Sequence, residues 1–128
     1  MRYPNVKFIL LHCYPFYREA GTLARVHANV HLDASWNALL SPALLECALN
    51  EWVGLVPHTK IFLSNDSTTP EECYGSSLFF REVTARVLAR KIEAGYFTRS
   101  AAVEAARAMF FDNAVRTFGN QIVQGKHA

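Results

Sequence analysis

The sequence predicts an α/β fold with three parallel strands, flanking helices and a helical C-terminal part. One observation is composition: the 128 residues are 51% hydrophobic and 19% charged, as in an ordered globular chain. The other is the order of segments, in which short apolar runs alternate with longer segments of helical periodicity. Such alternation indicates parallel βαβ units with right-handed crossovers. The length allows one domain and excludes a second of full size.

Three segments have the character of strands. Residues 6–11 form an almost continuous apolar run, which is typical of a strand buried on both faces. Residues 29–34 and 60–64 form the second and third candidates. The polar loop 65–70 follows the third.

The first two helices lie between these strands. Residues 17–27 form the first. The second begins at Ser41, a favourable N-cap, with Pro42 at its first position, and Gly54 and Pro57 end it. Its apolar residues share one face: Leu44, Leu45, Ala48, Leu49, Trp52 and Val53.

The chain after residue 70 is predicted to be helical. One helix ends at Gly95, the next is capped by Thr98, and a short last helix runs to Phe118 with Gly119 as its stop. The expected inward residues are Phe80, Val83, Val87, Leu88 and Ile92 in the first of these helices, then Val103, Ala106, Met109 and Phe110. We expect one domain over residues 1–120 and a disordered tail over 121–128.

Charge and cysteine content exclude several classes of partner and location. The net charge is +2, and the 13 basic residues are scattered, so no footprint for nucleic acid is present. The apolar runs are too short to cross a membrane. Three cysteines without metal-type spacing favour a reduced, cytoplasmic setting.

Each predicted strand leads into an ionisable residue at its carboxyl end: His12, Asp33 and Asp66. Parallel α/β folds bind ligands at this end of the sheet. A structural role is open for each residue. His12 is either a buried, hydrogen-bonded histidine or a ligand, and Asp66 is either a turn or N-cap residue or a functional carboxylate. Capping or loop hydrogen bonding is the role expected for Asp33.

Other reactive side chains are interpreted as structural. His27 and His31 are four residues apart but fall at a helix-to-strand junction, so they need not share a face. His58 precedes a strand and lies at the wrong end for chemistry. Cys13 is expected to pack in the core, because adjacent residues of a strand point to opposite faces and Cys13 therefore cannot pair with His12.

Four segments, in order, resemble the metal-dependent amidohydrolases of the family-2 type. The apolar strand that ends at His12 is similar to the sixth strand of that family, and Asn-Val-His-Leu-Asp-Ala-Ser at 29–35 to the seventh. The segment Lys-Ile-Phe-Leu-Ser-Asn-Asp-Ser at 60–67 resembles the eighth strand, and the ending at 109–119, with Asn-Ala-Val-Arg-Thr-Phe-Gly, resembles the closing motif. The resemblance is greatest to the branch fused to glutamine-synthetase-like proteins.

The resemblance implies a partial (β/α)8 barrel with three strands equivalent to strands six to eight. It implies that Asp66 binds a divalent metal, zinc or manganese, and takes a proton from the metal-bound water. His12 would be a metal ligand or a contact to substrate or water. Tyr74 and Arg81 would line the pocket for a small-molecule substrate, although packing and surface ion pairing are open for them. The reaction implied is hydrolysis of an amide, ester, lactone or related carbonyl compound.

The sequence departs from the family pattern in its ligands. It contains no His-x-His pair, and the fourth-strand ligand and fifth-strand histidine are absent. Two ligands do not complete a zinc site. We therefore expect a C-terminal barrel fragment that is inactive as an isolated chain, with or without bound metal, and that pairs with a complementary barrel half or with itself. One alternative is a non-catalytic, self-associating interaction module. Another is an unrelated small doubly wound domain, but no Gly-rich phosphate loop follows any of the strands, which counts against nucleotide binding.

Overall fold

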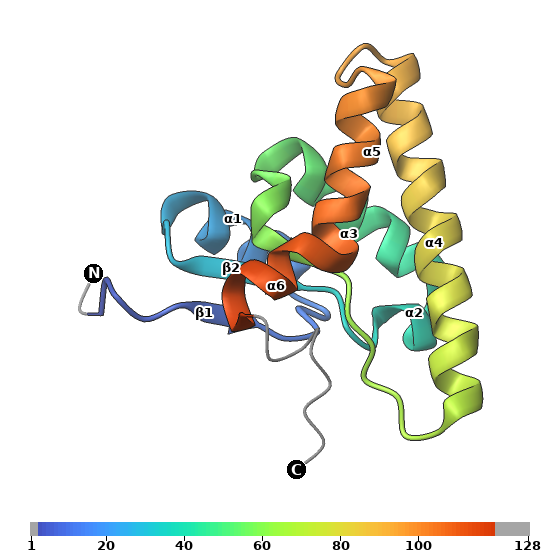
Figure 1. Ribbon diagram of the computed structural model, residues 1–128, viewed down its shortest axis with the longest axis horizontal. Coiled ribbons are helices and arrows are strands. Elements are labelled where there is room, and N and C mark those ends of the chain that lie inside the picture. Colours follow the sequence, from blue (N-terminus) through green and yellow to red (C-terminus); the bar gives the residue numbers. More distant parts are fainter. Residues whose placement is uncertain (1–2, 120–128) are drawn as a thin grey trace.

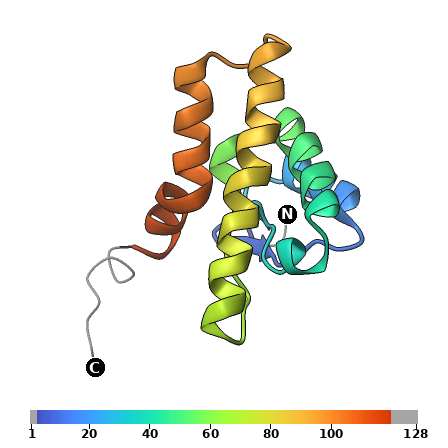
Figure 2. The ribbon, with the colours of Figure 1, turned by 90° about the vertical axis from the view of Figure 1, so that its right-hand side faces the viewer.

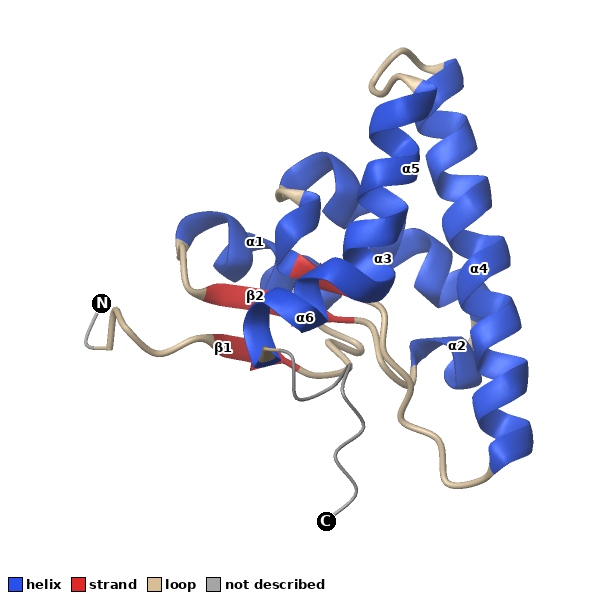
Figure 3. Ribbon diagram, viewed as in Figure 1, coloured by secondary structure: helices blue, strands red, loops and turns tan. Residues whose placement is uncertain are grey.

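A three-stranded parallel sheet lies at the centre of the computed structural model, which describes residues 3–119. Strands β1 (Phe8–Leu10), β2 (Val30–Asp33) and β3 (Ile61–Phe62) lie in this order (Figure 3). The register places Phe8 opposite Val30 and Leu32 opposite Ile61. The predicted α/β class with three parallel strands is confirmed. The expected tail at 121–128 lies outside the described residues.

Helices make up most of the described chain and pack against the sheet, leaving the β1 edge uncovered (Figure 1). They are α1 (Tyr17–Val26), α2 (Asn37–Leu40), α3 (Pro42–Leu55), a 3-10 turn (His58–Lys60), α4 (Pro70–Glu93), α5 (Arg99–Arg107), a π-helical turn (Ala108–Asp112) and α6 (Asn113–Phe118). The hydroxyls of Ser41, Thr69 and Thr98 accept hydrogen bonds from main-chain N–H groups three residues later. The predicted caps Ser41 and Thr98 are therefore confirmed.

The main core lies between the sheet and helices α1, α3 and α4. Leu32 and Ile61, which are register partners, are completely buried on this face. Trp52 of α3 is also completely buried, and its Nε1 donates to the carbonyl of Tyr17 at 2.8 Å. Helix α5 returns beside the long helix α4 and leads into α6 (Figure 2). Phe118 of α6 reaches the other face of the sheet.

The outer edge of β3 is covered by the C-terminal segment. Leu63 N–H donates to the Met109 carbonyl at 3.1 Å. The side-chain Nδ2 of Asn113 donates to the carbonyls of Ile61 and His58, both at 2.8 Å. These bonds satisfy main-chain groups that would otherwise be open to a further strand.

The opposite edge, formed by β1, is open. Phe8 N–H donates to the Asn29 carbonyl at 2.9 Å, so the main chain of Phe8 faces β2. The main-chain groups of Ile9 then face away from β2, because successive residues of a strand alternate in direction. Within residues 3–119, β1 is the terminal strand on this side. The side chains of Phe8 and Leu11 are 39% and 59% exposed.

The strands differ from the predicted ones in length and burial. The run 6–11 was expected to be buried on both faces, but β1 covers only 8–10 and is half exposed, because no element covers its outer edge. The third strand is limited to residues 61–62, since the chain before it forms a 3-10 turn.

Three features of the helices also differ. Helix α3 continues through Gly54 to Leu55, and the short α2 was not predicted. It follows Trp36, which has a left-handed conformation (φ 71°) that the sequence does not signal. Val103 was expected to point inward and is 65% exposed, because Ala102 and Ala105 form the buried face of α5. No helix within residues 3–119 is long and apolar enough to cross a membrane.

The substitution Asn113→Ala tests the closure of the β3 edge. It leaves the carbonyls of Ile61 and His58 without their donor. We expect the free energy of unfolding to fall by about 2–3 kcal/mol, measured by urea denaturation followed by circular dichroism. Asn50→Ala on the exposed face of α3 is the matched control, with an expected change below about 0.5 kcal/mol. Equal stability of the two variants would show that the bonds of Asn113 do not hold this edge.

Candidate functional site

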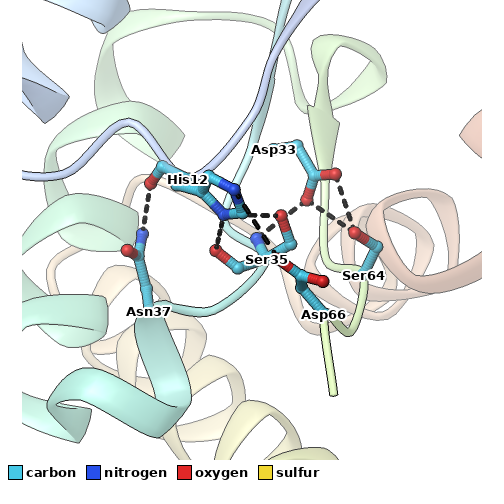
Figure 4. Close-up of polar contacts among 6 residues, drawn as sticks. All are labelled: His12, Asp33, Ser35, Asn37, Ser64 and Asp66. Atoms are coloured by element: carbon cyan, nitrogen blue, oxygen red, sulfur yellow. Dashed lines mark hydrogen bonds and ion pairs between the residues drawn. The ribbon is translucent and has the colours of Figure 1, made fainter. Parts of the chain in front are cut away.

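The ionisable residues that follow the three strands meet at one end of the sheet (Figure 4). His12 comes after β1, Asp33 ends β2, and Asp66 follows β3. Because the strands are parallel, their carboxyl ends share one edge. The structure therefore brings His12 and Asp66 together, as the sequence predicted from strand order.

Helix α2 and the loop before it fix the position of His12. His12 has a left-handed main chain (φ 64°), which turns the chain sharply after β1. Nδ2 of the buried Asn37 donates to the His12 carbonyl at 2.8 Å. The ring Nδ1 lies 3.1 Å from the Ser35 carbonyl, and the ring of Trp36 packs beside it at 5.5 Å between centroids.

These contacts determine which nitrogen of His12 carries hydrogen. A carbonyl oxygen only accepts, so Nδ1 is the donor to Ser35. Nε2 is the remaining nitrogen, and it lies 3.6 Å from Oδ2 of Asp66. A lone pair on Nε2 facing a carboxylate is unfavourable without a proton or a cation between them. A cation held between the two atoms would satisfy both of them.

Asp33 has a different role from the other two residues. It is buried, and its Oδ1 accepts from the Ser35 main-chain N–H at 2.9 Å. The Ser64 hydroxyl donates a hydrogen bond to Oδ2 of the same carboxylate at 2.7 Å. Asp33 therefore ties the ends of β2 and β3 together and holds the Ser35 turn that positions His12. This agrees with the loop hydrogen bonding expected for it.

Asp66 lies in the loop before α4 and is not the N-cap of that helix. Thr69 takes the capping position, and its hydroxyl accepts from Glu72 N–H. The side chain of Asp66 is 59% exposed, against 35% for His12. Asp66 is therefore accessible to solvent and to a bound molecule, and the N-cap alternative is excluded.

Tyr74 and Arg81 both lie on α4, the helix that follows the Asp66 loop. Tyr74 is 70% exposed, so it does not pack in the core. Arg81 lines a small cavity of about 160 Å³ together with Asn65 and Phe110. Their predicted contact with substrate stays a prediction.

Two expectations about reactive groups can be compared with the structure. Burial raises the pKa of the Cys13 thiol to about 11, so Cys13 packs in the core as expected and is a poor nucleophile. Among residues 3–119, His, Cys, Asp and Glu side chains nowhere gather in a group of three that could hold a metal ion. His12 and Asp66 alone do not make a complete metal site.

The sequence analysis missed Asn37, Ser35 and Ser64 as supports of the site. Asn37 binds the main chain of a residue 25 positions away, and this leaves no local pattern. Ser35 and Ser64 lie within the segments 29–35 and 60–67 that resemble the amidohydrolase motifs, which was the available signal.

Known proteins resemble this chain over nearly its whole length. It is 35% identical over 120 residues to the protein fluG of Emericella nidulans, a match covering 91% of this chain and 14% of that protein. It also matches the crystal structure of a Lactobacillus casei protein provisionally described as a metal-dependent hydrolase, with a TM-score of 0.80 and 29% identity. That match covers 94% of this chain and 31% of the other. No model of a protein family matches the chain. The chain thus spans less than a third of either relative.

Proposed function

We propose that this chain is part of a metal-dependent hydrolase of the amidohydrolase type, and that His12 and Asp66 supply two ligands of its divalent ion. The observation that carries this proposal is the 3.6 Å separation of His12 Nε2 and Asp66 Oδ2 at the carboxyl ends of parallel strands. Two ligands of one tetrahedral zinc ion, with bonds of about 2.0–2.1 Å, are about 3.4 Å apart. The pair fits two positions of such a site and leaves the others to be filled.

The comparisons support the remaining ligands being on another part of the polypeptide or on a partner. The match covers 31% of the Lactobacillus casei protein, so the rest of that protein is more than twice as long as the matched part. A complete (β/α)8 barrel has about 250 residues. In this proposal β1, β2 and β3 correspond to strands six to eight. The open edge of β1 then adjoins the fifth strand, and in the closed barrel the first strand pairs with β3 in place of Met109 and Asn113. The isolated chain is then not a competent hydrolase.

The residues of this chain would act as follows. A divalent ion such as zinc or manganese, when bound, would polarise the carbonyl group of the substrate and lower the pKa of a water molecule. The Ser35 carbonyl holds His12 with Nε2 directed into the site, and this fixes its tautomer. The exposed carboxylate of Asp66 accepts a proton from the attacking water. The substrate would be a small amide, ester or lactone, contacted by Tyr74 and Arg81. Three free cysteines fit a reducing, cytoplasmic setting.

A chimera tests this proposal without knowledge of the substrate. The matched part of the Lactobacillus casei protein is replaced with this chain, and bound metal is measured by mass spectrometry after gel filtration. We expect a folded chimera with stoichiometric divalent metal. His12→Gln and Asp66→Asn each remove a ligand, and we expect metal content to fall by about tenfold or more after dialysis.

The matched controls change the same chemical groups away from the site. Glu71→Gln lies on the exposed first turn of α4, and His27→Gln lies at the end of α1. Both should retain full metal content. If the His12 and Asp66 variants keep as much metal as these controls, the two residues are not ligands and the proposal is wrong.

A second candidate function is a self-associating interaction module, favoured by the open edge of β1. Pairing of β1 between two copies would give the main-chain N–H and C=O groups of Ile9 hydrogen-bond partners and would cover the side chain of Phe8. This predicts a dimer in sedimentation velocity, and Phe8→Lys should shift it to monomer, because a charge at an edge strand opposes pairing. Leu78→Lys, an exposed apolar residue on α4, is the control and should leave the dimer intact. A monomeric unmodified chain across the micromolar range contradicts this candidate.

A further inference from the structure

A second concave site lies at the amino ends of the strands, opposite the His12–Asp66 edge. It is a cavity of about 430 Å³ formed where the chain enters β1, β2 and β3. Five of its lining residues are basic: Lys7, Arg25, His31, Lys60 and Arg116. Aspartate and glutamate do not occur among its lining residues. We call it the basic pocket.

Two of the basic groups are held in place by helix ends. Lys60 Nζ donates to the carbonyls of Ala24 and His27 at the end of α1, the latter at 2.7 Å. Arg25 donates to the Leu55 carbonyl at the end of α3 at 3.0 Å. Each helix C-terminus carries about half a negative charge, so the two together offset about one of the four permanent cations. About three positive charges remain at the basic pocket.

The fold leaves hydrogen-bonding capacity free on other basic side chains of the pocket. Arg116 makes a long contact of 3.5 Å to Oδ1 of Asn113. The Nδ1 atom of His31 is buried and has no hydrogen-bond partner. Lys60 and Lys7 line the same cavity as His31, and with burial, the larger cause, their charges lower the pKa of its ring, while main-chain groups of Asn29 and Phe8 raise it. In the tautomer that carries its hydrogen on Nδ1, the His31 ring can donate this missing hydrogen bond to an oxygen of a bound anion.

We propose that the basic pocket binds a small anion that carries a phosphate group. Arginine and lysine provide the charged donors that phosphate oxygens accept, and the guanidinium of Arg116 can bind two of them. The cavity is in the range of small-molecule sites, so it accommodates a phosphate ester as well as free phosphate. This inference does not depend on the proposed hydrolase function, because the two sites lie at opposite ends of the strands.

NMR titration of the labelled chain tests this proposal. The probes are inorganic phosphate, ribose 5-phosphate and unphosphorylated ribose, each at constant ionic strength. We expect saturable shifts of the His31 ring with both phosphates and none with ribose. Lys7→Met and Arg116→Met should each weaken binding about tenfold, since each loses a charge-assisted hydrogen bond. Tighter binding of ribose 5-phosphate assigns the site to esters, and equal binding assigns it to free phosphate.

The control variant is Arg99→Met, which removes the same charge at the exposed start of α5. It should bind both phosphates as the unmodified chain does, and circular dichroism should show all three variants folded. The proposal is overturned if neither phosphate gives saturable shifts. It is also overturned if Arg99→Met weakens binding as much as the pocket variants, because the effect would then be one of net charge.

Discussion

Asn113 and Met109 close the outer edge of β3 by hydrogen bonding to its main chain, and this closure makes the sheet asymmetric. The chain thereby satisfies one edge with its own C-terminal helices, while the edge of β1 has no such cover within residues 3–119. An unpaired strand edge invites a partner, and in the isolated chain only the edge of β1 is open to one. Residues 108–113, far from β1 in sequence, occupy the other edge, and the first strand of a closed barrel would have to displace them.

The candidate site shows the same incompleteness in its chemistry. Asp33 joins the ends of β2 and β3 and supports the Ser35 turn, which aims Nε2 of His12 at Asp66. This arrangement presents the two groups that we propose as ligands. Metal sites need three or more protein ligands in most cases. In the proposed function, further polypeptide supplies both the remaining ligands and a neighbour for β1, and the larger relatives have the length for it.

The sequence predicted what local patterns encode. Apolar periodicity and caps such as Ser41 and Thr98 gave the parallel order of the strands and most helices, and strand order alone placed His12 and Asp66 together. It could not give the exposure of β1, because an apolar run looks the same at an edge and in the middle of a sheet. Nor could it give the role of Asn37, which acts through the main chain of His12. The basic pocket was also missed, since its charges come from five separate segments.

A zinc titration of the isolated chain, followed by NMR of the His12 ring and by calorimetry, tests whether His12 and Asp66 form part of a metal centre. We expect one weak site, with a Kd no tighter than about 1 µM, at which the His12 ring shifts on binding. Closed four-ligand zinc sites bind far more tightly, at about 10–16 kcal/mol. Binding of that strength would show that the chain holds a complete metal centre. An unshifted His12 ring at saturating zinc would show that this edge of the sheet holds none of the ligands.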